Sequence, residues 1–175
     1  PDVRVRQKIL ASASRLRAVL RAAPLPLGLV RSRIADEARG HVALRERYLA
    51  VRPTLSSSLL DEHVCRRLRK GIVRILRLCE LSYPREVVAS VRAHLFGKNS
   101  TLRANAFEVL DELVDRELSG RLADLVERYL AMRAGRFAKI AAPADALAIA
   151  WIDDELGDGE LYGAALAFDA MARRA

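Results

Sequence analysis

The apolar positions of this chain recur every three or four residues along most of its length, which is the spacing of an amphipathic α-helix. The pattern predicts a first helix that ends before Pro24 and a second, over about 29–51, that Pro53 ends. It also predicts a long third helix over 58–81, in which Ser58 and Asp61 have the spacing of a capping box. The first half of the chain is therefore expected to be helical.

Shorter, evenly spaced helices are predicted from Pro84 onward. They cover 84–96, 101–117, 119–133, 144–156 and 159–174, with short connections at 97–99, 135–143 and 157–159 and at Ser119–Gly120. Short connections make consecutive helices pack as antiparallel hairpins. Residues 102–110 (LRANAFEVL) partly match residues 161–169 (LYGAALAFD). We therefore expect an all-α fold, a single domain over 1–175 built as an α-solenoid of about eight antiparallel helices.

The segment from Arg69 to Leu118 carries a family likeness. It combines an aliphatic helix ending at 78–81, a Tyr83–Pro84 turn and the helix sequence LRANAFEVLD over 102–111. In these features it resembles the HEAT-like repeats found in bacteria C-terminal to major-facilitator or ADP/ATP-carrier-like transporter domains. The likeness covers 66–175 as HEAT-like hairpins. Residues 1–65 are N-terminal helices that either cap the array or belong to it.

The resemblance implies a set of repeat-structural residues. These are Leu102, Arg103, Ala104, Asn105, Ala106, Glu108 and Leu110. The small side chains of Ala104 and Ala106 suit the close approach of neighbouring helices. Asn105 lies inside an apolar helix, and a buried amide without a hydrogen bond costs about 1–3 kcal/mol. We therefore expect Asn105 to be buried and to have a hydrogen-bond partner.

Composition narrows the class of protein without indicating a reaction. The chain is 51% hydrophobic, 30% charged and 5% aromatic, with two cysteines, which excludes a disordered tail, a collagen-like chain and a disulfide scaffold. The few aromatic residues also count against an all-β protein. The chain starts at Pro1 within an expected helix, as a piece of a longer protein would.

The net charge of +8 is concentrated in the N-terminal half, where residues 1–80 hold 18 Lys and Arg against 7 Asp and Glu. Cations at spacings of three and four form a candidate anion- or partner-binding stripe on the third predicted helix: Arg66, Arg69, Lys70, Arg74 and Arg77. Together with Arg4, Arg6 and Lys8, such a stripe can meet nucleic acid or anionic lipid headgroups. The simpler interpretation is a solvated helix face.

Metal and thiol chemistry find little support. Cys65 and Cys79 lie about 21 Å apart on a continuous helix, too far for a disulfide, and are expected to be reduced and buried. His63 and Cys65 form a close pair, but a metal site needs more ligands at matching spacing. The acidic run over 153–160 departs from the calcium-loop pattern, since the third and twelfth positions counted from Asp154 are Leu156 and Ala165.

Catalytic motifs are also lacking. No glycine-rich loop with a following Lys is present to cradle a phosphate, and the serines at 56–58 have no nearby histidine. Some DNA glycosylases are HEAT-like and hold a lesion with Trp and Asp, for which Trp151 beside Asp153 and Asp154 is the comparable grouping. We expect no catalytic residue, no cofactor and no metal.

The sequence therefore predicts a non-catalytic helical-repeat interaction or scaffold domain, a soluble regulatory part of a larger protein. Its expected partner is another protein or a neighbouring domain of the same chain, in the cytoplasm, or at the cytoplasmic face of the membrane if a transporter precedes it. No transmembrane segment is predicted. The alternative is a nucleic-acid-binding HEAT-like module, or less favourably a HEAT-like DNA glycosylase, that uses the basic N-terminal half.

Overall fold

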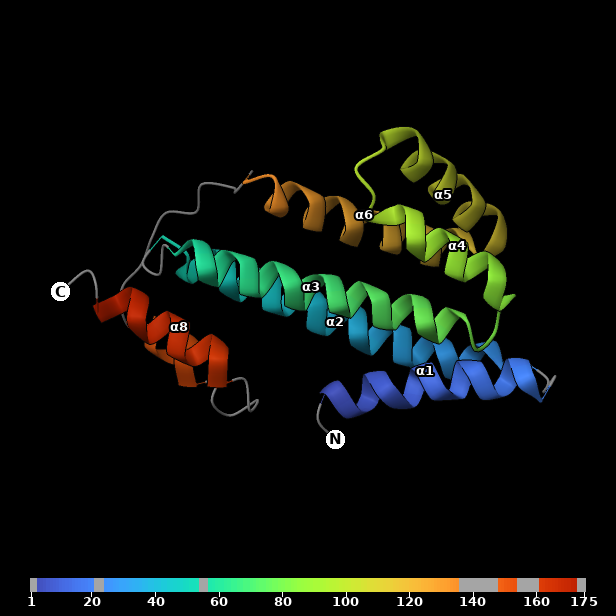
Figure 1. Cartoon of the computed structure of the whole chain (residues 1–175), viewed down its shortest axis with the longest axis horizontal. Coiled ribbons are helices and arrows are strands. Elements are labelled where there is room, and N and C mark those ends of the chain that lie inside the picture. The colour runs from blue at the N-terminus through green and yellow to red at the C-terminus, as the bar shows by residue number, and fades with distance from the viewer. Residues whose placement is uncertain (1–2, 21–23, 54–56, 136–147, 154–160, 173–175) are drawn as a thin grey trace. The chain divides into compact units, whose positions relative to one another are not determined.

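The residues described in the computed structural model are 3–20, 24–53, 57–135, 148–153 and 161–172. All regular secondary structure in these ranges is α-helical (Figure 1). The predicted all-α class is therefore confirmed for the described residues. Within the same ranges, no helix combines the length and the apolar character needed to cross a membrane.

The helices whose two ends are both described are α1 (Val3–Val19), α2 (Leu27–Val51), α3 (Ser58–Cys79), α4 (Arg85–Leu95), α5 (Ser100–Leu113), α6 (Arg116–Arg133) and α8 (Leu161–Ala172). The predicted ends of α2, α3 and α4 lie within two residues of the observed ones. Residues 148–153 are also helical. The rest of the predicted 144–156 helix and the connection over 157–159 lie outside the described residues.

The chain forms two compact units, each assembled from separate stretches of sequence. Unit 1 consists of Pro1–Gly40 with Lys70–Glu127, and unit 2 consists of His41–Arg69 with Arg128–Ala175. Helices α2, α3 and α6 each contribute one part to unit 1 and the other part to unit 2. The predicted division between N-terminal helices and hairpins, at 65–66, falls inside the continuous helix α3.

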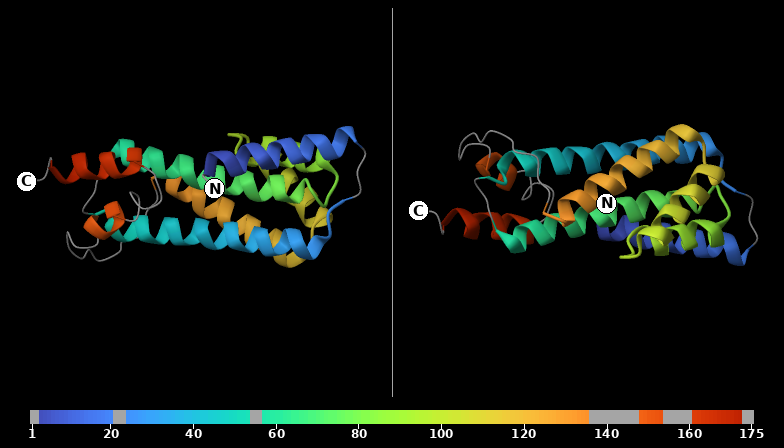
Figure 2. Two further views of the ribbon diagram at one scale, coloured as in Figure 1. Left: turned by 90° about the horizontal axis from the view of Figure 1, so that it is seen from below. Right: turned by 90° about the horizontal axis from the view of Figure 1, so that it is seen from above.

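In unit 1, α4 packs against α5, and the two helices lie side by side in every view (Figures 1 and 2). The first part of α2 is tied to the last part of α3 by an ion pair of 2.8 Å between Glu37 and Arg74. The core of unit 1 includes Val30, Ile34, Ile72, Ile75, Leu76, Val88, Val91, Leu95, Leu110 and Leu122, all buried. These are the apolar positions at spacings of three and four that predicted the helices.

Unit 2 has a core that includes aromatic residues. The ring of Tyr48 on α2 lies 6.1 Å from the ring of Trp151, and both side chains are buried. Leu60, Val64 and Leu68 bury the apolar face of α3 in the same unit. Trp151 is therefore a core residue in contact with Tyr48, and it does not lie on an open face beside Asp153.

The boundary between α5 and α6 differs from the prediction. The break lies at Val114 and Asp115, where Val114 is extended and the Asp115 carboxylate accepts a hydrogen bond from the Leu118 N–H at 3.1 Å. Asp115 therefore caps α6. The predicted break at Ser119–Gly120 is wrong, because Ser119 is buried inside α6 and donates a hydrogen bond to the Asp111 carboxylate.

The start of α3 also corrects the prediction. Ser57, rather than Ser58, precedes the helix, and its hydroxyl accepts a hydrogen bond from the Leu60 N–H at 3.5 Å. Asp61 does not complete a capping box. Its carboxylate accepts two hydrogen bonds from Arg52, at 2.8 and 2.9 Å, and a third from the Tyr48 hydroxyl.

The repeat-structural residues on α5 are less buried than the sequence predicts. Ala106 and Leu110 are buried, and Arg103 donates a hydrogen bond to the Gly97 carbonyl at 3.1 Å. Leu102, Ala104, Asn105 and Glu108 are exposed. The expectation of a buried Asn105 amide with a required partner is therefore wrong, because water solvates this face of the helix.

Candidate partner-binding cleft

A cleft opens in unit 1 between the first part of α2 and the first part of α6. Positions 31, 34, 35 and 38 share one face of α2, and positions 118, 122 and 125 share one face of α6. Ile75 of α3 also lines the cleft. The periodicity that makes both helices amphipathic therefore also places their facing side chains.

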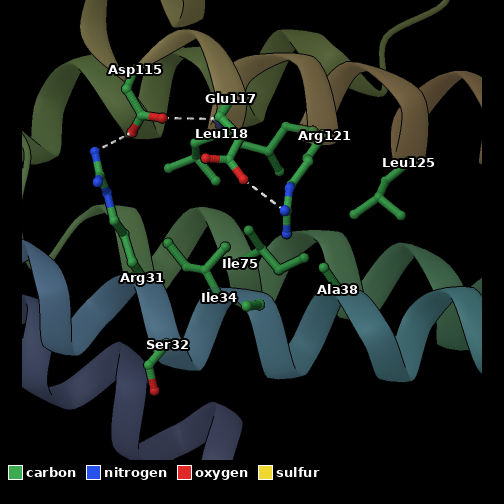
Figure 3. Close-up of a pocket in the computed structure, with 12 residues that line it drawn as sticks. Arg31, Ser32, Ile34, Ala38, Ile75, Asp115, Glu117, Leu118, Arg121 and Leu125 are labelled. Atoms are coloured by element: carbon green, nitrogen blue, oxygen red, sulfur yellow. Dashed lines mark hydrogen bonds and ion pairs between the residues drawn. The ribbon is translucent and has the colours of Figure 1, made fainter.

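The cleft has an apolar floor and a charged rim (Figure 3). Its volume is about 300 Å³. The floor consists of Ile34, Ile75, Leu118, Leu122 and Leu125, which are buried, together with the half-buried small residues Ala35 and Ala38. The small residues of α2 leave open space opposite the buried leucines of α6.

Two ion pairs form the rim of the cleft. Arg31 of α2 lies 2.7 Å from the Asp115 carboxylate, and Arg121 lies 2.6 Å from Glu117, one helical turn away. Burial raises the pKa of Asp115, but the Leu118 N–H and the Arg31 guanidinium outweigh it and hold the pKa below its usual value. The rim therefore presents both signs of charge with no net excess.

The predicted cationic stripe is divided by the structure. Arg66, Arg69 and Lys70 are exposed, and Arg66 lies 2.7 Å from Glu62 on the same helix. Arg74 is largely buried in its ion pair with Glu37. Arg77 is half-buried, and burial followed by the neighbouring Arg92 lowers its pKa. The expectation that all five cations form one solvated stripe is wrong for Arg74 and Arg77.

A second hollow, of about 690 Å³, lies in unit 2. Its lining is mixed and includes Arg52, Asp61, Cys65, Arg66, Arg69, Tyr129 and Arg133. The Asp61 carboxylate is already occupied by Arg52 and Tyr48. Burial and the Asp61 carboxylate raise the pKa of the Tyr48 hydroxyl well above its usual value. Asp61 and Tyr48 are therefore engaged in structural contacts.

The two thiols are free, and burial disfavours the thiolate form of each. Burial raises the pKa of Cys65, which is half-buried, and raises the pKa of the buried Cys79 to about 12. A reactive cysteine needs the opposite shift. The ring of His63 lies 5.3 Å from that of Tyr162, and no three potential metal ligands come together among the described residues.

The residues of the cleft were not singled out by sequence. Arg31 and Asp115 are 84 positions apart, and no local motif links them. The available signal was the apolar periodicity of the two segments, which indicates an inward face without indicating the opposing helix.

Comparison with protein-family models, curated proteins and solved structures finds no match to this chain.

Proposed function

We propose that the chain is a non-catalytic helical-repeat interaction domain of the HEAT-like kind, a regulatory part of a larger cytoplasmic protein. The proposal includes the stacking of its antiparallel helices as a solenoid. The observation that supports an interaction role most directly is the cleft between α2 and α6. An apolar floor with a few fixed charges at its rim is the usual construction of a protein's binding groove.

The occupant that suits this cleft is one amphipathic helix of a partner protein. Aliphatic side chains spaced by three and four would fill the space above Ala35 and Ala38, in the manner of helix-in-groove recognition. The rim pairs Arg31–Asp115 and Arg121–Glu117 would meet polar residues that flank these anchors. Because the rim carries no net charge, it favours a protein segment over a polyanion.

A displayed library of randomised helical peptides tests this proposal. Peptides selected on the whole chain should share aliphatic residues at spacings of three and four. Their affinity should fall by about tenfold or more in Ala38→Trp, which fills the cleft. Gly40→Trp is the matched control, because Gly40 is exposed on the opposite face of α2 and a side chain there meets open space. Failure to select such peptides, or equal binding to Ala38→Trp, rejects the cleft as the binding site.

The alternative of nucleic-acid binding rests on the exposed cations Arg66, Arg69 and Lys70. It predicts that a fluorescent duplex binds at low salt, that binding weakens steeply as salt rises, and that it is lost in the triple Arg66→Glu, Arg69→Glu, Lys70→Glu variant. The interaction proposal predicts that the triple variant and the wild type do not differ in duplex binding. The same measurement therefore separates the two functions.

A further inference from the structure

The helix α1 packs against the rest of unit 1 through one face, and that face is polar. Ser14 is buried and donates a hydrogen bond to the Glu80 carboxylate at 2.7 Å. Arg17 donates hydrogen bonds to the backbone carbonyls of Glu80 and Tyr83, at 2.5 and 3.3 Å. Leu10 and Ala13, on the same side of the helix, are half-buried. The packing of α1 through this face therefore leaves most of its large aliphatic side chains exposed.

The opposite face of α1 carries an exposed aliphatic stripe: Val5, Ile9, Leu16, Val19 and Leu20. At 100° per residue these positions fall within about 100° of one another around the helix. Their exposed fractions run from 47% at Val5 to 78% at Val19. Five exposed large aliphatic side chains on one side of a helix are an extended apolar feature, unlike single exposed residues, which need no explanation.

The charge of α1 has one sign. Its 17 residues include Arg4, Arg6, Lys8, Arg15 and Arg17 and no acidic residue. Lys8 and Arg15 are exposed and lie on one border of the aliphatic stripe, and the exposed Ser12 lies within the stripe, between the turns of Ile9 and Leu16. An apolar stripe bordered by cations is the pattern of a helix that lies in the plane of a membrane interface.

We propose that α1 is a membrane-surface helix that binds an anionic lipid bilayer, with its aliphatic stripe in the interface and the exposed Lys8 and Arg15 against the headgroups. The helix lies on the bilayer and does not cross it. Each cation near an anionic surface strengthens partitioning by about fivefold, so the exposed Lys8 and Arg15 together favour anionic over neutral lipid by about 25-fold.

Two other binding partners suit the exposed face of α1 less well. Nucleic acid would satisfy the cations but would leave the aliphatic stripe facing phosphates and water. A second copy of α1 would cover the stripe but would bring Lys8 and Arg15 of both copies together, and α1 has no acidic residue to compensate them. An anionic lipid surface satisfies both the apolar and the cationic side chains.

Vesicle flotation of the whole chain tests the proposal. The chain should bind phosphatidylcholine vesicles containing about a third phosphatidylglycerol at least about tenfold more strongly than vesicles of phosphatidylcholine alone. The double variant Ile9→Gln, Leu16→Gln should lose about tenfold or more of this binding, because it removes two aliphatic anchors. Both positions are exposed, so the helical circular dichroism spectrum should not change.

Matched control variants elsewhere in unit 1 distinguish binding through α1 from nonspecific attraction of the chain to the vesicles. Leu102→Gln with Val109→Gln removes two exposed aliphatic side chains of α5 and should leave binding unchanged. Lys8→Glu with Arg15→Glu should reduce binding by more than about tenfold, whereas Lys98→Glu with Arg116→Glu, equal in charge, should reduce it much less. Lys98 and Arg116 are both exposed.

Insertion has its own spectroscopic readout. Trp151 is buried, so a tryptophan placed by Val19→Trp reports a new, exposed position on α1. Its emission should shift to the blue on anionic vesicles, and that of Val109→Trp should not. The proposal is overturned if the chain does not bind anionic vesicles, if the α1 and control variants lose binding equally, or if the Val19→Trp emission does not shift. None of these outcomes bears on peptide binding in the α2–α6 cleft, which is tested separately.

Discussion

Glu80 is a buried charge in unit 1 that contacts residues of two other helices. Its side chain is 4% exposed. Ser14 of α1 donates to one carboxylate oxygen, and the Arg92 guanidinium of α4 lies 3.1 Å from the other in an ion pair. Arg77 interacts electrostatically with both Glu80 and Arg92. One carboxylate therefore joins α1 and α4 to the end of α3.

Replacing Glu80 by Gln keeps the shape of the side chain and removes its charge. Arg92 then loses the counter-charge of Glu80, and breaking a buried pair in this way costs about 3–5 kcal/mol. Because Arg92 is 28% exposed, water compensates in part, and we expect about 3 kcal/mol, the lower end of that range. With a denaturant dependence of about 1–3 kcal/mol per molar urea, the midpoint should fall by about 1–3 M.

Urea denaturation followed by far-ultraviolet circular dichroism measures this loss. The control is Glu117→Gln, which breaks the exposed pair with Arg121 and should cost no more than about 0.5 kcal/mol. In Glu80→Gln, Arg92→Met the unpaired cation is gone, so the double variant should be more stable than the sum of the single losses predicts. A midpoint for Glu80→Gln as high as that of Glu117→Gln would refute the structural role assigned to Glu80.

Three further predictions concern single positions. Gly40→Ala should raise the free energy of unfolding by about 0.5–1 kcal/mol, because Gly40 lies within a helix and an added Cβ there meets no neighbouring atom. Gly135→Ala should lower the free energy of unfolding by about 1–2 kcal/mol, because Gly135 follows α6 with a φ of 72°. The urea midpoints of both variants check these values. Asp115→Ala should cost about 1 kcal/mol by removing the cap of α6. Because folding lowers the pKa of Asp115, its carboxylate stabilises the fold at neutral pH. This stabilisation is lost as the pH falls from the usual pKa of an aspartate through the lower pKa that Asp115 has in the folded protein. The wild type and Asp115→Ala should therefore become equally stable in acid. Under native conditions a thiol-alkylating reagent should modify Cys65 well before Cys79, whose pKa is raised by burial to about 12, and equal rates would contradict the burial of Cys79.

Local pattern was sufficient for most helix boundaries and insufficient for one. The apolar spacing located α2, α3 and α4, because the residues that form each stripe are neighbours on one helix. It misplaced the boundary after α5, because Ser119 and Gly120 resemble a loop in sequence. Ser119 is instead buried and hydrogen-bonded to Asp111, and the carboxylate of Asp115 begins the next helix.

The candidate sites depended on contacts that sequence spacing does not reveal. Helical spacing placed five cations on one face of α3, but Glu37 of α2 lies opposite Arg74 and removes it from the solvent. In the same way, the α2–α6 cleft combines residues from two segments that share no motif. Periodicity indicates which side of a helix is apolar, and tertiary packing decides which helix lies against it.

The sequence by itself determined that α1 is a helix and that Ile9, Leu16 and Val19 share one face of it, because both follow from spacing along the chain. Only the tertiary structure decided which face is attached. The buried carboxylate and backbone carbonyl of Glu80 need hydrogen-bond donors, and Ser14 and Arg17 supply them from the polar side of α1. A buried acceptor without a donor costs about 1–3 kcal/mol. The polar face of α1 therefore turns inward, where its donors are needed, and the aliphatic face stays exposed.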